Sequence, residues 1–311
     1  MTNNPDNIVI KAAGLSKKYK DITAVDNISF MVERGKCFGF LGPNGAGKSS
    51  TMKMIYGLSP ITGGDLNVLG LDIKRDLSKI KAKLGVVPQE NNLDPDLNVY
   101  ENLIIYANYF GIAKDKAVEK TRELLKFVNL EDKADKKADK LSGGMKRRLI
   151  IARALINDPD IVILDEPTTG LDPQSRHLLW DKMFELKSKN KTLILTTHYM
   201  DEAYHLCDHI FIMDKGRIIA QGSPRDLISE NLPPFVIEYN GDRSLDSELI
   251  KTLGTNLDSY QKTFASLLLF VRDSSLATTT LKPYEANLSS RKPNLEDVFI
   301  KLTGREIAEG E

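Results

Sequence analysis

The sequence of 311 residues predicts an α/β fold with a β-rich core, a helical subdomain and a small α+β extension at the C-terminus. Three patterns favour this fold class. The apolar runs at 161–164 and 192–196 are short and do not alternate, which is typical of parallel strands covered on both faces. Between residues 90 and 158 the apolar positions fall at helical spacing instead. Strand-like runs return at 235–239 and 266–271, where we expect a smaller unit.

The first 60 residues predict strands followed by a phosphate-binding loop. Apolar patterns at 8–10, 28–32 and 37–41 predict strands, and residues 49–55 can begin a helix. The loop between strand and helix fits G-x-x-x-x-G-K-[ST], in which glycines let backbone NH groups close around phosphate oxygens at the positive end of the helix dipole. We therefore expect the loop to bind a nucleotide through Gly42, Pro43, Asn44, Gly45, Ala46, Gly47, Lys48 and Ser49.

The helical subdomain, at about 90–158, offers a second anion site. One buried helical stripe is predicted at Ala117, Thr121, Leu124, Leu125 and Val128. Ser142 is an N-cap candidate for the helix that follows it, and Gly143 and Gly144 expose that helix terminus to an anion. The three cations at 146–148 form too short a run for a nucleic-acid patch, so we interpret them as one solvated helix face.

Two adjacent carboxylates follow the apolar strand at 161–164. Asp165 could hold Mg²⁺ through water while Ser49 ligates the ion directly. Glu166 could orient or deprotonate the water that attacks the terminal phosphate. The pair therefore predicts hydrolysis of the bound nucleotide.

The C-terminal part of the chain predicts a separate small domain. The pattern breaks at 222–224, and we place the domain boundary near residue 238, which gives domains at 8–238 and 239–311. Asn294 can cap a last helix, and Gly304 can end it. The apolar stripe of this helix, which should dock rather than float, contains Leu295, Val298, Phe299 and Leu302.

Composition excludes several classes of protein. Lys+Arg and Asp+Glu are equal at 43 each, so no global positive field gathers nucleic acid. Cys37 and Cys207 lie far apart without a C-x-x-C partner, which argues against a structural zinc site and a secreted disulfide framework. The chain has no signal-peptide pattern and no run of 18 apolar residues, so we expect it neither to be secreted nor to span a membrane.

These motifs, in this order over roughly residues 8–238, resemble the ATP-binding subunits of ABC transporters. The resemblance implies ATP and Mg²⁺ as cofactors, extends the phosphate loop to Ser50, and makes Ser142, Gly143 and Gly144 the signature motif that contacts nucleotide. It identifies Asp165 and Glu166 as the metal-binding and catalytic carboxylates. By the same resemblance four further residues have roles: the adenine-stacking Tyr19, Gln89 near Mg²⁺, the D-loop Asp172 and the switch histidine His198.

The resemblance also implies an assembly. Two such subunits pair head to tail, each ATP lying between the phosphate loop of one and the signature helix of the other, beside a separately encoded transmembrane permease. The chain would then lie peripherally on the cytoplasmic face of the inner membrane and bind no nucleic acid. Several segments resemble a narrower branch, the ATPases of anthracycline-resistance and nodulation lipo-oligosaccharide exporters. Met145 departs from the glutamine of many relatives and cannot donate a hydrogen bond to the partner's nucleotide.

Two other functions compete with the exporter subunit. A soluble ABC ATPase that acts on nucleic acid or ribosomes is disfavoured, because such relatives typically carry coiled coils, zinc modules or tandem cassettes, and none of these is present in the sequence. An ATP-binding regulator without turnover is disfavoured because Glu166 and His198 are both present. GTPases usually carry an Asn-Lys-x-Asp element, whereas Asn190 and Lys191 are followed by Thr192 and Leu193.

Overall fold

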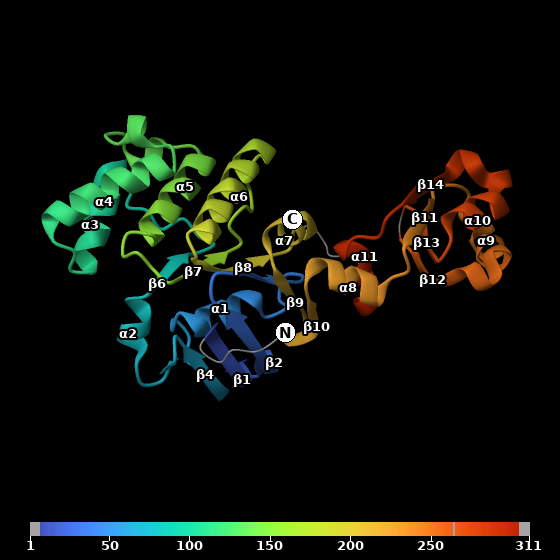
Figure 1. Ribbon diagram of the computed structural model, residues 1–311, viewed down its shortest axis with the longest axis horizontal. Coiled ribbons are helices and arrows are strands. Elements are labelled where there is room, and N and C mark those ends of the chain that lie inside the picture. The colour runs from blue at the N-terminus through green and yellow to red at the C-terminus, as the bar shows by residue number, and fades with distance from the viewer. Residues whose placement is uncertain (1–6, 264, 305–311) are drawn as a thin grey trace. The chain divides into compact units, whose positions relative to one another are not determined.

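The computed structural model describes residues 7–263 and 265–304, and the chain divides between Ile218 and Ile219 into two compact units (Figure 1). This division precedes the boundary that the sequence suggested near residue 238. Strand β11 (Phe235–Tyr239) explains the difference, because both of its neighbours in its sheet, β13 and β14, belong to the second unit. The break in the sequence pattern at 222–224 therefore lies nearer to the structural division than residue 238 does.

A largely parallel sheet forms the centre of the first unit. Its strand order is β10-β9-β3-β8-β7-β6, and the pairs β3/β8, β3/β9, β7/β8 and β6/β7 are parallel. Strands β3 and β7 are buried along their whole length, as their unbroken apolar runs predict. The strands of this sheet are β3 (Cys37–Leu41), β6 (Leu84–Val87), β7 (Ile161–Asp165), β8 (Thr192–Thr197), β9 (His209–Asp214) and β10 (Arg217–Gly222).

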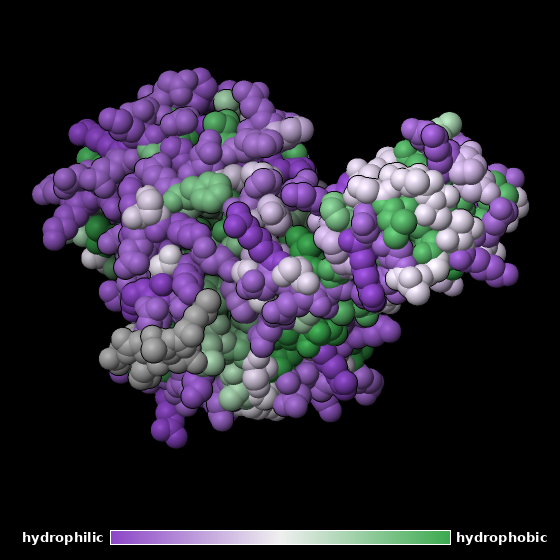
Figure 2. Space-filling model, turned by 45° about the vertical axis from the view of Figure 1, so that its right-hand side comes forward, coloured by the Kyte–Doolittle hydropathy of each residue, from purple (hydrophilic) through white to green (hydrophobic). Residues whose placement is uncertain are grey.

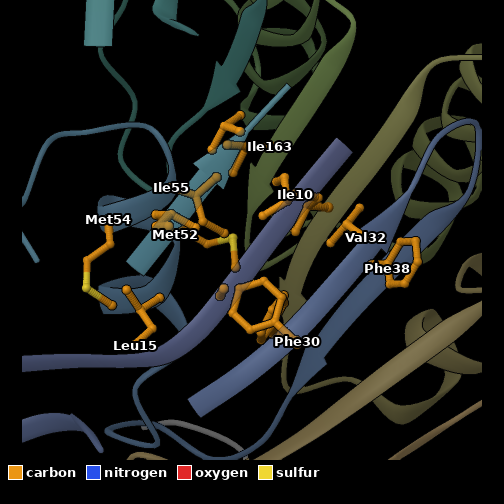
Figure 3. Close-up of a cluster of buried hydrophobic side chains, with 14 of the residues drawn as sticks. Ile10, Leu15, Phe30, Val32, Phe38, Met52, Met54, Ile55 and Ile163 are labelled. Carbon is orange, nitrogen blue, oxygen red and sulfur yellow. The ribbon is translucent and has the colours of Figure 1, made fainter. Parts of the chain in front are cut away.

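An antiparallel sheet with the order β2-β1-β4-β5 packs against helix α1. Its strands are β1 (Ile8–Tyr19), β2 (Ile22–Glu33), β4 (Gly63–Val68) and β5 (Leu71–Asp72). Figure 3 shows Leu15, Phe30 and Met52 in the shared core between this sheet and helix α1 (Lys48–Ile55). The core therefore anchors the second half of α1 through Met52, Met54 and Ile55, and it also includes Ala46 of the loop that precedes α1.

Besides α1, the described first unit contains six α-helices, and the three between residues 90 and 158 form the helical subdomain (Figure 1). The six are α2 (Leu77–Lys81), α3 (Val99–Tyr109), α4 (Lys114–Phe127), α5 (Gly143–Ala154), α6 (Pro173–Ser188) and α7 (Met200–Leu206), with 3₁₀ turns at Glu131–Lys133 and Ala138–Lys140. Helices α3, α4 and α5 contact one another, and the predicted stripe on α4 is buried. The interpretation of 146–148 as a solvated face is wrong for Arg147, which is only 7% exposed.

The second unit contains an antiparallel sheet with the order β12-β13-β11-β14. Its other strands are β12 (Leu257–Lys262), β13 (Leu267–Val271) and β14 (Leu288–Arg291), and its helices are α8 (Pro224–Asn231), α9 (Asp246–Leu253), α10 (Ser274–Thr280) and α11 (Leu295–Thr303), with 3₁₀ turns at Arg243–Leu245, Gly254–Asn256 and Lys282–Asn287. Strand β13 is fully buried, and apolar side chains of α9 and α10 join its core.

The last helix docks as predicted. Asn294 caps α11 in a reciprocal capping box with Asp297, and Gly304 ends the helix in the left-handed conformation. Helix α11 contacts α8 and buries Phe299 completely. Leu302 differs from the expectation, since it is 37% exposed, one residue before the helix ends.

Hydropathy along the described residues bears on whether a helix could cross a membrane. Figure 2 shows hydrophilic residues over most of the visible face, with hydrophobic residues in separate small groups. Across residues 7–263 and 265–304, every helix is too short or too polar to cross a bilayer.

Candidate functional site

The predicted phosphate loop lies between β3 and α1 and is shaped by its glycines. Gly45 and Gly47 have φ angles of 81° and 102°, in the region that favours glycine. A Cβ at Gly47 would lie 2.5 Å from the carbonyl oxygen of Ala24, so no larger residue fits there. Lys48 is 4% exposed, and its Nζ donates to the carbonyl oxygens of Gly42 and Pro43 at 2.7 and 3.0 Å. The carbonyl oxygens of the loop therefore bind the loop's own lysine. The glycines, which have no side chains, let an anion approach the loop backbone closely.

Ser49 and Asp165 meet at the edge of the parallel sheet. Ser49 Oγ donates to Asp165 Oδ1 at 3.0 Å, although the residues lie 116 positions apart. Asp165 is 3% exposed, and its Oδ1 also accepts a hydrogen bond of 2.5 Å from Thr196 Oγ1. The carboxyl ends of β7 and β8 thus place Asp165 Oδ1 and Thr196 Oγ1 close to Ser49 in the first turn of α1.

Glu166 is the centre of a buried cluster. Its Oε2 accepts from Gln89 Nε2 at 3.3 Å and from Thr169 Oγ1 at 3.2 Å, and lies 3.6 Å from His198 Nδ1. Its Oε1 lies 3.8 Å from Lys48 Nζ. The imidazole of His198 and the ammonium of Lys48 hold the pKa of the Glu166 carboxyl below its ordinary value, against the opposing effect of burial. Glu166 is therefore ionised at neutral pH, as a general base must be.

The pKa of Lys48 is lower than that of an exposed lysine. Burial lowers the pKa of its ammonium, and the carboxylates of Glu166 and Asp165 only partly oppose this. The desolvated cation lacks water of its own, so an incoming phosphate replaces contacts to carbonyl oxygens with a charged partner.

The signature residues form the exposed start of α5. Ser142 Oγ accepts from the backbone NH of Met145 at 3.3 Å, which confirms Ser142 as the N-cap. A Cβ on Gly143 would meet nothing within 4 Å, and the first turn of α5 holds no acidic residue. Within the part of the chain that the structure describes, no hydrogen bond or ion pair links this turn to the phosphate loop. The two anion sites of one chain are therefore not brought together.

Asp172 lies close to the signature motif. It caps α6, since its carboxylate accepts from the backbone NH and the hydroxyl of Ser175 at 2.9 and 2.7 Å. A Cβ on Gly144 would come within 2.7 Å of Ser175 Oγ. Asp172 and the start of α5 thus form one surface of the chain, and within the described residues Asp172 makes no hydrogen bond to Glu166.

Tyr19 stands at the end of β1, apart from the carboxylates. Its ring is 42% exposed, its hydroxyl lies 3.2 Å from Ser59 Oγ, and Lys17 Nζ lies 4.6 Å from the ring centroid. Lys17 is itself buried and donates to the carbonyl oxygen of Pro60 at 2.7 Å. The ring is therefore held from one side and retains exposed surface on which a base could stack.

A buried carboxylate that sequence reasoning missed lies behind the site. Glu202 on α7 is 0% exposed, and its Oε1 accepts from Thr168 Oγ1 at 2.8 Å and from Trp180 Nε1 at 3.3 Å. Burial raises the pKa of Glu202. The sequence offers only a carboxylate in the first turn of a short helix, where an acidic residue ordinarily faces solvent at the positive end of the helix dipole.

The residues present fit a magnesium ion that shares its coordination with phosphate. Mg²⁺ prefers oxygen ligands, keeps several waters and usually takes one or two protein ligands. Ser49 Oγ and Asp165 Oδ1 supply two oxygens 3.0 Å apart, and Gln89 contacts Glu166, the residue that follows Asp165. In the described ranges of the chain, no group of three or more His, Cys, Asp or Glu residues could hold a metal by itself.

Comparison with known proteins agrees with this geometry. The family model described as "ABC transporter" matches residues 25–169. The Nod factor export ATP-binding protein I of Ralstonia nicotianae is 44% identical over 307 residues, 96% of this chain and 95% of that protein. The protein of the same name from Rhizobium etli is 44% identical over 300 residues, 96% and 94% of the two chains.

Solved structures extend the likeness to the fold. The cbiO1 protein of Clostridium perfringens, part of the ABC transporter complex cbiONQ, superposes with a TM-score of 0.67 at 30% identity and covers 72% of this chain and 92% of its own. A dimeric ATP-binding cassette in a post-hydrolysis state bound to ADP and Pi gives a TM-score of 0.64 at 28% identity, over 69% and 98% of the two chains.

The chain belongs to the ATP-binding subunits of ABC transporters. It binds ATP and is an ATPase, and its first unit has the phosphate-loop fold of that family. The alternative of a soluble ABC ATPase that acts on nucleic acid or ribosomes is disfavoured. The relatives named above match nearly the whole chain, and they are ATP-binding proteins of exporters.

Proposed function

We propose that this ATPase powers export through a separately encoded membrane permease, by ATP-driven head-to-tail pairing of two copies. One observation carries the proposal. The phosphate loop and the open start of α5 at Ser142 are two anion-binding elements, and no hydrogen bond joins them within one described chain. A second copy turned end to end would present its helix terminus to the triphosphate in the first copy's loop.

The roles of the loop residues follow from their chemistry. The backbone NH groups between Gly42 and Ser50 bind the phosphates, and Lys48 supplies a charge for the terminal phosphate groups. Ser49 and Asp165 would hold Mg²⁺, which neutralises phosphate charge when bound. Tyr19 stacks on adenine through its exposed ring surface. The γ-phosphate adds charge that both Lys48 and the partner's α5 can bind, so ATP favours the paired state over ADP.

The catalytic roles centre on Glu166. Its carboxylate accepts the proton of the attacking water, or orients that water, because it is ionised and buried. Gln89 donates to Oε2 of Glu166, and His198 Nδ1 lies 3.6 Å from the same oxygen, so both side chains would lie near the terminal phosphate. Asp172 lies on the surface shared with Gly144, where the pairing of two copies would bring it near the partner's site.

The cargo and location rest on the named relatives. Those relatives are Nod factor export proteins, so a lipo-oligosaccharide or a related amphiphile is the cargo class that we propose. The chain would lie peripherally on the cytoplasmic face of the inner membrane through its permease, and bind no nucleic acid. The permease itself would bind the cargo.

The pairing can be tested with a variant that binds ATP without turnover. Glu166→Gln protein should double its mass in light scattering with ATP and Mg²⁺, and remain monomeric with ADP. Adding Ser142→Arg to that background should prevent the dimer while each chain still binds ATP by calorimetry. A Glu166→Gln chain that stays monomeric with ATP, even when copurified with its permease from membranes, would refute the proposal.

A further inference from the structure

Arg147, on the first turns of α5, binds the backbone of two catalytic segments. Its Nε donates to the carbonyl oxygen of Pro167 at 2.7 Å, and its Nη1 to that of Pro88 at 2.5 Å. Its Nη2 donates to the carbonyl oxygens of Asp165 and Glu166 at 2.9 and 3.0 Å. One guanidinium therefore joins the signature helix to the segment before Gln89 and to the end of β7.

The backbone at Glu166 needs this support. Its φ angle is 45°, in the left-handed region, which residues other than glycine rarely adopt and which persists only where the surroundings hold it. The NH of Glu166 donates to Thr196 Oγ1 at 3.0 Å, and its carbonyl oxygen accepts from Arg147. The peptides on both sides of the strained residue are thus fixed, and the turn directs its side chain towards Lys48 and His198.

Only arginine can make this set of bonds. A guanidinium carries five NH donors in a rigid planar fork, whereas lysine offers three donors from a single nitrogen. Burial lowers the pKa of Arg147 to about 10 while the carboxylates of Asp165, Glu202 and Glu166 oppose the shift, so the group is charged at neutral pH. Its charge also lies beside the two carboxylates of the catalytic strand.

We propose that Arg147 is a positioning residue that holds Glu166 in its left-handed conformation from the signature helix of the same chain. Hydrolysis at one site then depends on where that chain's own α5 lies. This inference rests on the proposed function, in which the start of α5 grips the nucleotide of the partner. When the start of α5 binds the nucleotide held by the partner, Arg147 would transmit the position of α5 to Glu166 of its own chain. Each catalytic base would therefore respond to nucleotide bound at the other site of the pair.

The same helix provides a matched control. Arg148 also donates to backbone carbonyl oxygens, at 2.8 Å to Val128 and 3.2 Å to Asn129, but these lie within the helical subdomain and away from Glu166. Loss of Arg148 removes a cation and two bonds from α5 without touching the catalytic segments. A kinetic effect that is specific to Arg147 is therefore distinguishable from a general weakening of α5.

The first experiment compares steady-state ATP hydrolysis by Arg147→Lys, Arg147→Met and Arg148→Met. We expect kcat to fall about 10- to 100-fold in both Arg147 variants, because a small misplacement of a catalytic group has effects of this size. ATP affinity, measured by calorimetry, should stay within about threefold, and the Hill coefficient should fall towards one, since closure no longer reaches the base. Arg148→Met should keep the wild-type kcat. Wild-type kcat in Arg147→Lys, or equal losses in Arg147→Met and Arg148→Met, would overturn the proposal.

The second experiment asks whether Arg147 acts through Glu166. In the Glu166→Gln background, Arg147→Lys should cause no further loss of the residual rate, because residues that act as a unit are not additive. Additive losses would overturn the positioning role. The ATP-induced dimer of Glu166→Gln separates the two ideas: its absence refutes the paired site, whereas its presence together with wild-type turnover in Arg147→Lys refutes only the role of Arg147.

Discussion

The ammonium of Lys48 lies 3.8 Å from the Oε1 carboxylate oxygen of Glu166, and the two side chains are 4% and 6% exposed. The proposed phosphate-binding cation and the proposed catalytic base therefore face each other in a region with little access to solvent. Lys48 is one of the causes that hold the pKa of Glu166 low. An anion that takes up the charge of Lys48 removes that cause, so binding of the terminal phosphate leaves a more basic carboxylate.

Replacement of Lys48 by alanine should weaken nucleotide binding. The change removes a desolvated charge aimed at the phosphates, and hydrogen bonds to charged groups contribute about 1.5–3 kcal/mol, so we expect ATP affinity to fall about 10- to 100-fold. Calorimetry with ATP measures this. Lys79→Ala on α2 is the control, because Lys79 is exposed and pairs only with nearby Asp76. Unchanged ATP affinity in Lys48→Ala would contradict the assignment of the loop.

Replacement of Glu166 by glutamine should separate binding from turnover. Glutamine keeps the size of the side chain and its contacts to Gln89 and Thr169, but it cannot accept a proton at neutral pH. Phosphate release should fall about 10²- to 10⁴-fold, the usual contribution of a general base, with ATP affinity retained. Wild-type phosphate release in this variant would show that another group activates the water.

Replacement of Glu202 by alanine should destabilise the first unit. The change leaves the hydroxyl of Thr168 and the indole NH of Trp180 buried without an acceptor, at a cost of about 1–3 kcal/mol. Urea unfolding followed by tryptophan fluorescence reports on this directly, because Trp180 is the only tryptophan of the sequence. A midpoint equal to that of the wild type would mean that the carboxylate does not stabilise this region.

Glu202 should also make stability depend on pH. Because its pKa is raised in the folded protein, its contribution to the free energy of unfolding is complete below the ordinary glutamate pKa of about 4.5, and it is lost as pH rises through the raised value. Glutamine has no such dependence. The melting temperature of wild type relative to Glu202→Gln should therefore fall as pH rises above about 4.5, and parallel curves would contradict a raised pKa.

Replacement of Phe299 by alanine should loosen the end of the second unit. A fully buried phenylalanine contributes about 3–5 kcal/mol in such a substitution, so hydrogen exchange in α8 and α11 should accelerate. Leu302→Ala on the same helix is the control, because Leu302 is 37% exposed. Equal acceleration in the two variants would indicate that α11 is not held by its buried face.

Local patterns predicted the parts of the site that depend on neighbours in sequence. The glycine loop, the N-cap Ser142 and the carboxylates after β7 all follow from a few adjacent residues, and the structure contains each of them where the pattern indicated. The predicted cap Asn294 and stop Gly304 of α11 are confirmed for the same reason.

Residues that act across long separations were not predictable. Thr196 meets Asp165 only because β7 and β8 are neighbours in the sheet, and no local pattern distinguishes it from other strand threonines. Arg147 was interpreted as solvated because it stands between two other cations. Each helical step turns by about 100°, so three adjacent side chains point in different directions and one of them can face the core. Sequence alone does not say which one.

The close approach of Gly144 to Ser175 has an evolutionary consequence. A methyl group at position 144 would meet the Ser175 hydroxyl at 2.7 Å, and that hydroxyl cannot simply rotate away, because it donates to Asp172. A substitution of Gly144 by a larger residue would therefore require a compensating substitution at position 175. Paired replacement at these two sites, 31 positions apart on different helices, is the trace that this contact should leave among descendants of a common ancestor.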